Sequence, residues 1–196
     1  MGSGWRLKVF GLTTAISVND VTYEQAYDVY LKTLKDDKKV NISTQSDLES
    51  YHKWFDRINK LGKLNADYET FIRLFEENYK RIDVYDDVVN YIYSLKGKCN
   101  LCIFSDLIFC CFKALCEDIN LDTFDYKFLS YKEHLKKGNI DAFKNVEEKL
   151  GVNPKDILFV DNNMENIDNA KKRKWNTCFA NGYDPDKIKE AVEKFI

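Results

Sequence analysis

Side chains able to bind metal or phosphate follow directly after short apolar runs in this chain. One apolar run ends at Asp161 and Asn162, and an earlier one ends at Ser105. A carboxylate at the end of a strand is well placed to meet a metal ion or phosphate, because ligands of α/β sheets lie beyond the carboxyl ends of the strands. Lys137, in a polar run, could add an ammonium charge. The pattern predicts a site for an anion, a metal ion or both.

Strand and helix patterns alternate in the second half of the chain and must position these side chains. Strands that alternate with helices through short loops require parallel pairing with right-handed crossovers. The predicted fold is therefore an α/β fold with a doubly wound parallel sheet. Its strands are expected at 7–10, 99–104, 126–129, 157–160 and 177–180, and its helices at 107–119, 140–150, 165–174 and from 185 onward.

The segment between the first strand and residue 97 has a helical period instead. Apolar residues recur at i, i+3, i+4 and i+7 in a helix that starts at a capping box formed by Thr22 and Gln25. A second box, Ser46 with Glu49, starts the next helix, and two more helical patterns follow. These helices are expected to form an insert at residues 17–96, beside a core made of residues 1–16 and 97–196.

Composition and charge argue against several classes of partner. The 196 residues suffice for one core with a small subdomain, and a net charge of −2 gives no general attraction to nucleic acid or anionic membranes. The chain has no run of about 18 apolar residues and no secretory leader pattern, which favours a cytoplasmic protein with no membrane partner. The six cysteines lie mostly in apolar patterns and are expected to be reduced thiols.

The order and spacing of these elements resemble the haloacid dehalogenase-like (HAD) hydrolase superfamily, in particular its members with a helical cap. Residues 101–106 look like the second motif of that family, 130–137 like the approach to the third, and 158–166 like the fourth. The resemblance covers nearly the whole chain. It implies a Rossmann-like HAD core with the helical insert as a cap subdomain.

The resemblance also shows what the chain has lost. In the family, the first motif supplies a nucleophilic aspartate that becomes phosphorylated, and a second aspartate two residues later acts as general acid and base. The matching positions here are Gly11 and Thr13. Glycine has no atom with which to attack, and threonine cannot exchange a proton near neutral pH as a tuned carboxylic acid can. No catalytic residue is therefore expected at either position.

Binding roles in the family match residues that this chain retains. Ser105 and Lys137 match phosphate-binding positions. The family holds magnesium through the first aspartate, which is absent here, through a backbone carbonyl that corresponds to Thr13, and through a carboxylate that corresponds to Asp161. Asn162 stands where a second carboxylate is common. Because magnesium prefers about six oxygen ligands in a strict octahedron, the resemblance implies a weakened magnesium site.

Each of these positions also has a structural interpretation. Lys137 could be a solvated loop lysine, and Lys136 takes its role if the loop is shifted by one residue. Ser105 and Asp161 could cap the helices that follow them. Asp106, where the family often has asparagine, is interpreted as structural.

Two functions follow from this sequence. The first is a HAD-like protein without phosphatase activity that binds phosphate, a small phosphorylated metabolite or, through the cap, a protein partner. The alternative is a magnesium-dependent hydrolase that cleaves phosphomonoesters of a small metabolite with a non-standard nucleophile. Turnover of generic phosphomonoesters would separate the two.

Overall fold

A computed structural model describes residues 84–107, 119–182 and 184–196, together with residues 49, 52–53, 55–57, 60, 67–69, 112 and 116–117. The described residues of 84–106 and 119–196 belong to one compact unit, and the others belong to a second. Gly11 and Thr13, the expected strand 7–10 and the capping box at Thr22 lie outside the described residues.

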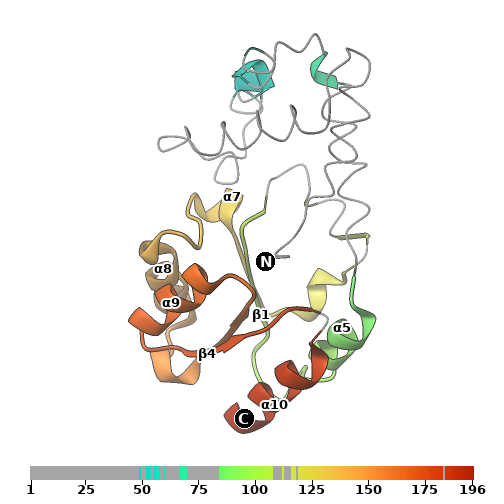
Figure 1. Cartoon of the computed structure of the whole chain (residues 1–196), viewed down its shortest axis with the longest axis vertical. Helices are drawn as coiled ribbons and strands as arrows, with labels where there is room; N and C mark the ends of the chain where they lie inside the picture. The colour runs from blue at the N-terminus through green and yellow to red at the C-terminus, as the bar shows by residue number, and fades with distance from the viewer. Residues whose placement is uncertain are drawn as a thin grey trace. The chain divides into compact units, whose positions relative to one another are not determined.

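Parallel strands form the centre of the first unit (Figure 1). Strand β1 pairs with β2, and β3 pairs with β4, both in parallel. The register sets Ser105 beside Leu129 and Asp161 beside Phe179, so the carboxyl ends of each pair lie together. The strands are β1 (Cys102–Ser105), β2 (Tyr126–Leu129), β3 (Leu158–Asp161) and β4 (Asn176–Phe179).

Helices cover both faces of these strands. Successive side chains of a strand point to opposite faces, and β3 shows this clearly. Phe159 packs in a cluster with residues of α8 and α9, whereas Leu158 and Val160 pack against a cluster that includes residues of α10. The prediction of a doubly wound α/β fold is therefore confirmed. The helices are α5 (Asp86–Tyr93), α7 (Ser130–Glu133), α8 (Ile140–Leu150), α9 (Met164–Lys172) and α10 (Pro185–Phe195), with 3-10 turns at Leu121–Thr123 and Pro154–Asp156.

Asparagine side chains start several of these elements. Asn139 accepts a hydrogen bond from the Asp141 N–H at the start of α8, and Asn163 accepts one from the Glu165 N–H at the start of α9. An asparagine in this position satisfies an N–H group that has no partner inside the helix. Helix α8 ends at Gly151, whose φ of 63° is the left-handed conformation that glycine adopts without steric cost.

An aromatic cluster fills the face beneath α8 and α9. Phe143 is fully buried, and its ring centroid lies 5.2 Å from that of Trp175 and 5.6 Å from that of Phe159, both in edge-to-face geometry. The Trp175 Nε1–H donates a hydrogen bond of 2.7 Å to Glu147. The left-handed turn after α9 is made by Lys174, at φ 67°, one residue before Trp175. Trp175 therefore anchors the core, and Lys174 makes the turn that leads into it.

Helix α5 lies against α10 on the other face (Figure 1). Leu95, just after α5, is buried with Ile188 and Val192 of α10. The residues expected to end the insert therefore pack with the strands of the first unit. The boundary between core and cap at residue 97 stays a prediction.

Several element bounds lie one or two residues from the predicted ones, and two larger differences stand out. Strand β1 begins at Cys102, three residues later than expected, because Leu101 is tied to Asp125 by backbone and side-chain hydrogen bonds and a turn at Gly97 precedes it. The start of the polar run after β2 forms the short helix α7, which ends at His134 in a left-handed conformation. Within the described residues, no helix has the length and apolar character needed to cross a membrane.

Candidate functional site

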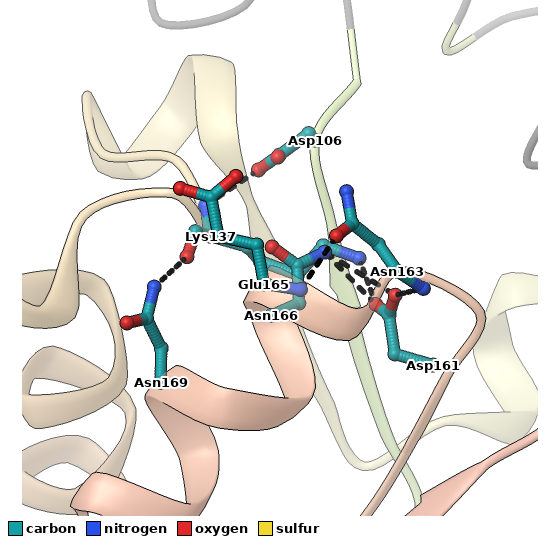
Figure 2. A network of polar contacts seen from close by, with 7 residues as sticks. All are labelled: Asp106, Lys137, Asp161, Asn163, Glu165, Asn166 and Asn169. Atoms are coloured by element: carbon teal, nitrogen blue, oxygen red, sulfur yellow. Dashed lines mark hydrogen bonds and ion pairs between the residues drawn. The ribbon is translucent and has the colours of Figure 1, made fainter.

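A network of polar side chains lies at the carboxyl ends of β1 and β3 (Figure 2). Asp106 follows the last residue of β1, and Asp161 is the last residue of β3. Lys137 reaches them from the loop between α7 and α8, and Asn166 and Asn169 come from α9. All of these residues belong to the first compact unit.

An ion pair between Lys137 and Asp161 is the central contact. The Lys137 Nζ lies 2.6 Å from the Asp161 Oδ2, and the two side chains are only 14% and 6% exposed. The same ammonium lies 6.0 Å and 5.9 Å from the ring centroids of Phe104 and Phe159, near the limit for attraction between a cation and an aromatic face. The charge pair is thus held against the aromatic core rather than in bulk water.

The Asp161 carboxylate accepts further hydrogen bonds from its own loop and from α9. The Asn163 N–H donates to Oδ1 at 2.7 Å. The Asn166 amide lies 3.2 Å from Oδ1 and 3.3 Å from Oδ2. Together with Lys137, these contacts bring two donors to each oxygen. A carboxylate has about four lone-pair sites, so these three donor groups, with the Asn166 amide shared between both oxygens, occupy most of its accepting capacity.

The backbone of Lys137 is fixed on both sides (Figure 2). Its N–H donates to the Asp106 Oδ1 at 2.9 Å, and its carbonyl oxygen accepts from the Asn169 amide at 3.1 Å. Asn169 is itself buried on α9. These two contacts set where the lysine side chain begins and therefore where its ammonium can reach.

Asp106 is the second acid of the site, and its surroundings change its acidity. The Asp106 side chain is exposed by surface area, yet neighbouring protein atoms limit the water around its carboxyl, and this desolvation raises the pKa of Asp106 above its ordinary value of 3.8. The Lys137 N–H and the charges of Lys137 and Lys136 oppose this shift, whereas the Asp161 charge adds to it. Asp106 therefore holds its proton more strongly than a solvated aspartate does.

The structure brings together some of the residues singled out from the sequence. Lys137, and not Lys136, contacts Asp161. Ser105 lies half-buried at the end of β1, next to Asp106, and Asn162 lies partly exposed beside Asp161. The positions of Gly11 and Thr13 lie outside the described residues.

The backbone donors at the start of α9 are partly engaged. The Asn163 N–H bonds to Asp161, and the Glu165 N–H bonds to the side chain of Asn163. An incoming anion would compete with these internal acceptors for the same two donors. The helix terminus therefore offers an anion fewer free donors than an uncapped helix start would.

Three supporting residues were not assigned to the site from the sequence. Asp106 holds the Lys137 backbone, and Asn166 and Asn169 reach the site from α9. Asn163, Asn166 and Asn169 recur every three residues, a spacing that keeps side chains near one face of a helix. That spacing, which begins inside the predicted fourth motif, was the available signal.

The described residues do not fit a magnesium ion as they are arranged. Magnesium needs about six oxygen ligands with free lone pairs. Three hydrogen-bond donor groups, one of which is an ammonium, already occupy most of the lone pairs of the Asp161 carboxylate. Among the residues that the structure describes, no group of three or more His, Cys, Asp or Glu side chains is placed to hold a metal.

No protein-family model matches the sequence, and no curated protein does. The fold, however, is similar to that of solved HAD structures. The HAD family enzyme BT-2542 from Bacteroides thetaiotaomicron, in complex with magnesium and inorganic phosphate, aligns with a TM-score of 0.67 at 15% identity over 92% of this chain and 88% of its own. A predicted HAD-like family hydrolase from Porphyromonas gingivalis aligns with a TM-score of 0.61 at 14% identity, over 86% and 89%.

The aligned structures share the α/β architecture across most of both chains. An aspartate-to-alanine variant of BT-2542, also in complex with magnesium and inorganic phosphate, aligns with a TM-score of 0.63 at 17% identity over 81% of this chain and 86% of its own. The chain therefore has the HAD-like hydrolase fold with a Rossmann-like core, as the sequence resemblance implied.

Proposed function

We propose that this chain is a HAD-like protein that binds inorganic phosphate or a small phosphorylated metabolite without hydrolysing it. The observation that carries the proposal is the Lys137 ammonium held at the Asp161 carboxylate, where two parallel strands end. Ligands of α/β folds bind at such strand ends. A fixed cation there, with Ser105 at the end of strand β1, suits a phosphate group.

The lysine retains donors for an anion. An ammonium carries three N–H donors, and the described hydrogen bonds of Lys137 use one of them, toward Asp161. The hydroxyl of Ser105 can donate another hydrogen bond. A phosphate oxygen that meets these donors in a partly desolvated site forms charge-assisted hydrogen bonds, which are stronger than neutral ones.

Loss of hydrolysis follows from the residues at the first motif. Gly11 and Thr13 supply neither the attacking carboxylate nor the acid that the HAD resemblance requires. Removing the nucleophile of another hydrolase lowered its rate by about 10⁶. The expected residue at the reacting position is therefore insufficient for phosphoryl transfer by the family mechanism.

The solved relatives support the binding half of the proposal. BT-2542 was crystallised with magnesium and inorganic phosphate, both as the wild type and as a variant in which one aspartate is replaced by alanine. In that protein, loss of one carboxylate is compatible with a bound phosphate. By analogy of fold, this chain could also lack acids and still bind phosphate.

The alternative function is a magnesium-dependent phosphomonoesterase with a non-standard nucleophile. The observation in its favour is that the structural relatives are HAD family enzymes and that Asp161 is retained and buried at the end of β3. In this alternative Asp161 holds the metal with the Thr13 carbonyl and Asn162. Replacing Asp161 with alanine would then abolish turnover.

A binding assay and an activity assay together test the proposal. Calorimetric titration with inorganic phosphate should show saturable binding to the wild type. Lys137→Gln should weaken it by about tenfold or more, because one charge-assisted contact is lost, whereas Lys136→Gln should change it by less than about twofold. Absence of phosphate binding, or loss of equal size in both variants, would contradict the proposal.

Activity is measured on generic phosphomonoesters with millimolar magnesium. We expect no turnover by the wild type. The double variant Gly11→Asp with Thr13→Asp should gain measurable turnover, because it restores a nucleophile and an acid. Wild-type turnover that disappears in Asp161→Ala would establish the alternative function.

The remaining parts of the proposal concern location and partners. A helical cap at residues 17–96 would set ligand specificity or bind a protein partner, and the chain would act in the cytoplasm. Its net charge of −2 supports neither nucleic acid nor membrane as a partner.

A further inference from the structure

We propose that Lys137 is a built-in counter-ion that excludes divalent cations from Asp161, so that anion binding at this site does not depend on magnesium. The inference rests on the proposed function, because it concerns the same site and describes how phosphate binds there. Its physical basis is competition between two cations for one carboxylate.

First, the Asp161 carboxylate is largely surrounded by hydrogen-bond donors. Each of its oxygens faces two donors, from Lys137, Asn163 and Asn166. These three donor groups occupy most of the roughly four lone-pair sites, and a divalent cation, which needs lone pairs that point at it, competes with them. The Asn163 donor is a backbone N–H next to α9, and the Asn166 amide is buried. The lysine ammonium, at the end of a long flexible stem, is therefore the donor that a cation would displace most easily.

The second step is that displacement of Lys137 is unfavourable. Its backbone is held by Asp106 and Asn169, so the ammonium stays tethered near the carboxylate even when the direct contact opens. A divalent ion at Asp161 would then lie close to a like charge in a site partly shielded from water, where repulsion is stronger than in bulk solvent. Magnesium also gives up its own water reluctantly.

The third step is that phosphate has no such conflict. An anion approaches the ammonium from the side that does not face Asp161, and the remaining N–H donors of Lys137 point toward it. The lysine already neutralises Asp161, so the anion does not meet an uncompensated carboxylate. Lys137 thus supplies the positive charge between the Asp161 carboxylate and the phosphate that a metal ion would otherwise supply.

Magnesium titration in the absence of phosphate tests the inference directly. Calorimetry compares the wild type with Lys137→Met, which keeps the length of the stem but removes the charge. The matched control is Lys136→Met, the same change on the adjacent residue, which has no contact with Asp161 in the described network. We expect Lys137→Met to bind magnesium about tenfold more tightly than the wild type, or better, and Lys136→Met to stay within about twofold of the wild type.

Equal magnesium affinity in the wild type and Lys137→Met would overturn the inference, as would an equal gain in both variants. A second measurement keeps it testable if Lys137→Met does not fold. Phosphate affinity of the wild type is measured with millimolar magnesium and with a chelator, and we expect the two values to agree within about twofold. Phosphate binding about tenfold tighter with magnesium would refute the inference.

The outcomes separate this inference from the proposed function. If the wild type binds no phosphate under either condition while Lys137→Met gains magnesium affinity, the proposed function fails and the counter-ion role stands. If phosphate binds only with magnesium, the binding function stands and the counter-ion role fails.

Discussion

The buried ion pair between Lys137 and Asp161 predicts a large coupling free energy in the unfolding equilibrium. The two charged groups are 2.6 Å apart, and their side chains are 14% and 6% exposed. Removing one partner of a buried pair costs about 3–5 kcal/mol, because the other charge is left without compensation. Asp161→Asn keeps the shape of the side chain and should fall near the lower limit, since the ammonium retains some access to water.

A double-mutant cycle measures the pair itself. Urea unfolding of the wild type, Asp161→Asn, Lys137→Met and the double variant gives the interaction free energy, which we expect to be about 2 kcal/mol. A surface pair serves as the control. Lys144 and Glu148 lie 3.5 Å apart with side chains 59% and 65% exposed, and their cycle should give about 0.5 kcal/mol or less.

The two cycles decide whether the pair forms in the folded protein. A coupling for Lys137 and Asp161 no larger than that for Lys144 and Glu148 would mean that the ammonium spends most of its time in water. The proposal that Lys137 occupies the Asp161 carboxylate and keeps divalent cations away would then be wrong, whatever the phosphate assays show. An unchanged unfolding m-value across the variants is needed for the comparison, because a changed m-value signals a different unfolded state or a departure from two-state behaviour.

Three further predictions concern the support of the site. Trp175→Phe keeps an aromatic ring in the core but loses the hydrogen bond to Glu147. In urea titrations it should lower the free energy of unfolding by about 1 kcal/mol. An unchanged free energy would show that this hydrogen bond makes no net contribution to stability. Lys174→Gly should have an unfolding free energy about 1 kcal/mol higher than Lys174→Ala, because glycine adopts a φ of 67° without steric cost. Equal stability of the two variants would show that the backbone at position 174 is not strained by a side chain. Burial raises the pKa of Asp106, so its stabilising contribution is present below pH 3.8 and is lost as the pH rises through the folded-state pKa. The unfolding free energy of the wild type minus that of Asp106→Asn should therefore fall with rising pH over that window, and a difference that rises would refute the shift.

Local pattern was enough to predict most elements of the fold. The strand at 126–129 and the helix at 140–150 have the predicted bounds. The strand was marked by a short apolar run, and the helix was marked by its helical period. The strand before Ser105 was misplaced because its start depends on Asp125, which lies 24 residues from Leu101 in the sequence. Contacts of that separation leave no local signal.

The sequence predicted where the candidate site lies, but not which of its side chains contact one another. Ser105 and Asp161 end their strands as expected, since parallel pairing brings strand ends together. That Lys137 would pair with Asp161 could not be read from the sequence, because the contact depends on where Asp106 and Asn169 hold the loop. The role of Trp175 was likewise invisible until Glu147 was placed beside it.

Charge balance connects the absent acids with the lysine at Asp161. The described site holds the carboxyl groups of Asp106 and Asp161 and one lysine, Lys137, whose ammonium contacts Asp161 and whose backbone N–H contacts Asp106. Two further carboxylates in place of Gly11 and Thr13 would leave several negative charges for one lysine, a balance that favours a divalent cation. Without them, Lys137 pairs with Asp161 and balances its charge. If the proposed function and the counter-ion role of Lys137 both hold, the absence of first-motif acids and the lysine at Asp161 are expected to accompany each other, because both reduce the need for a divalent cation.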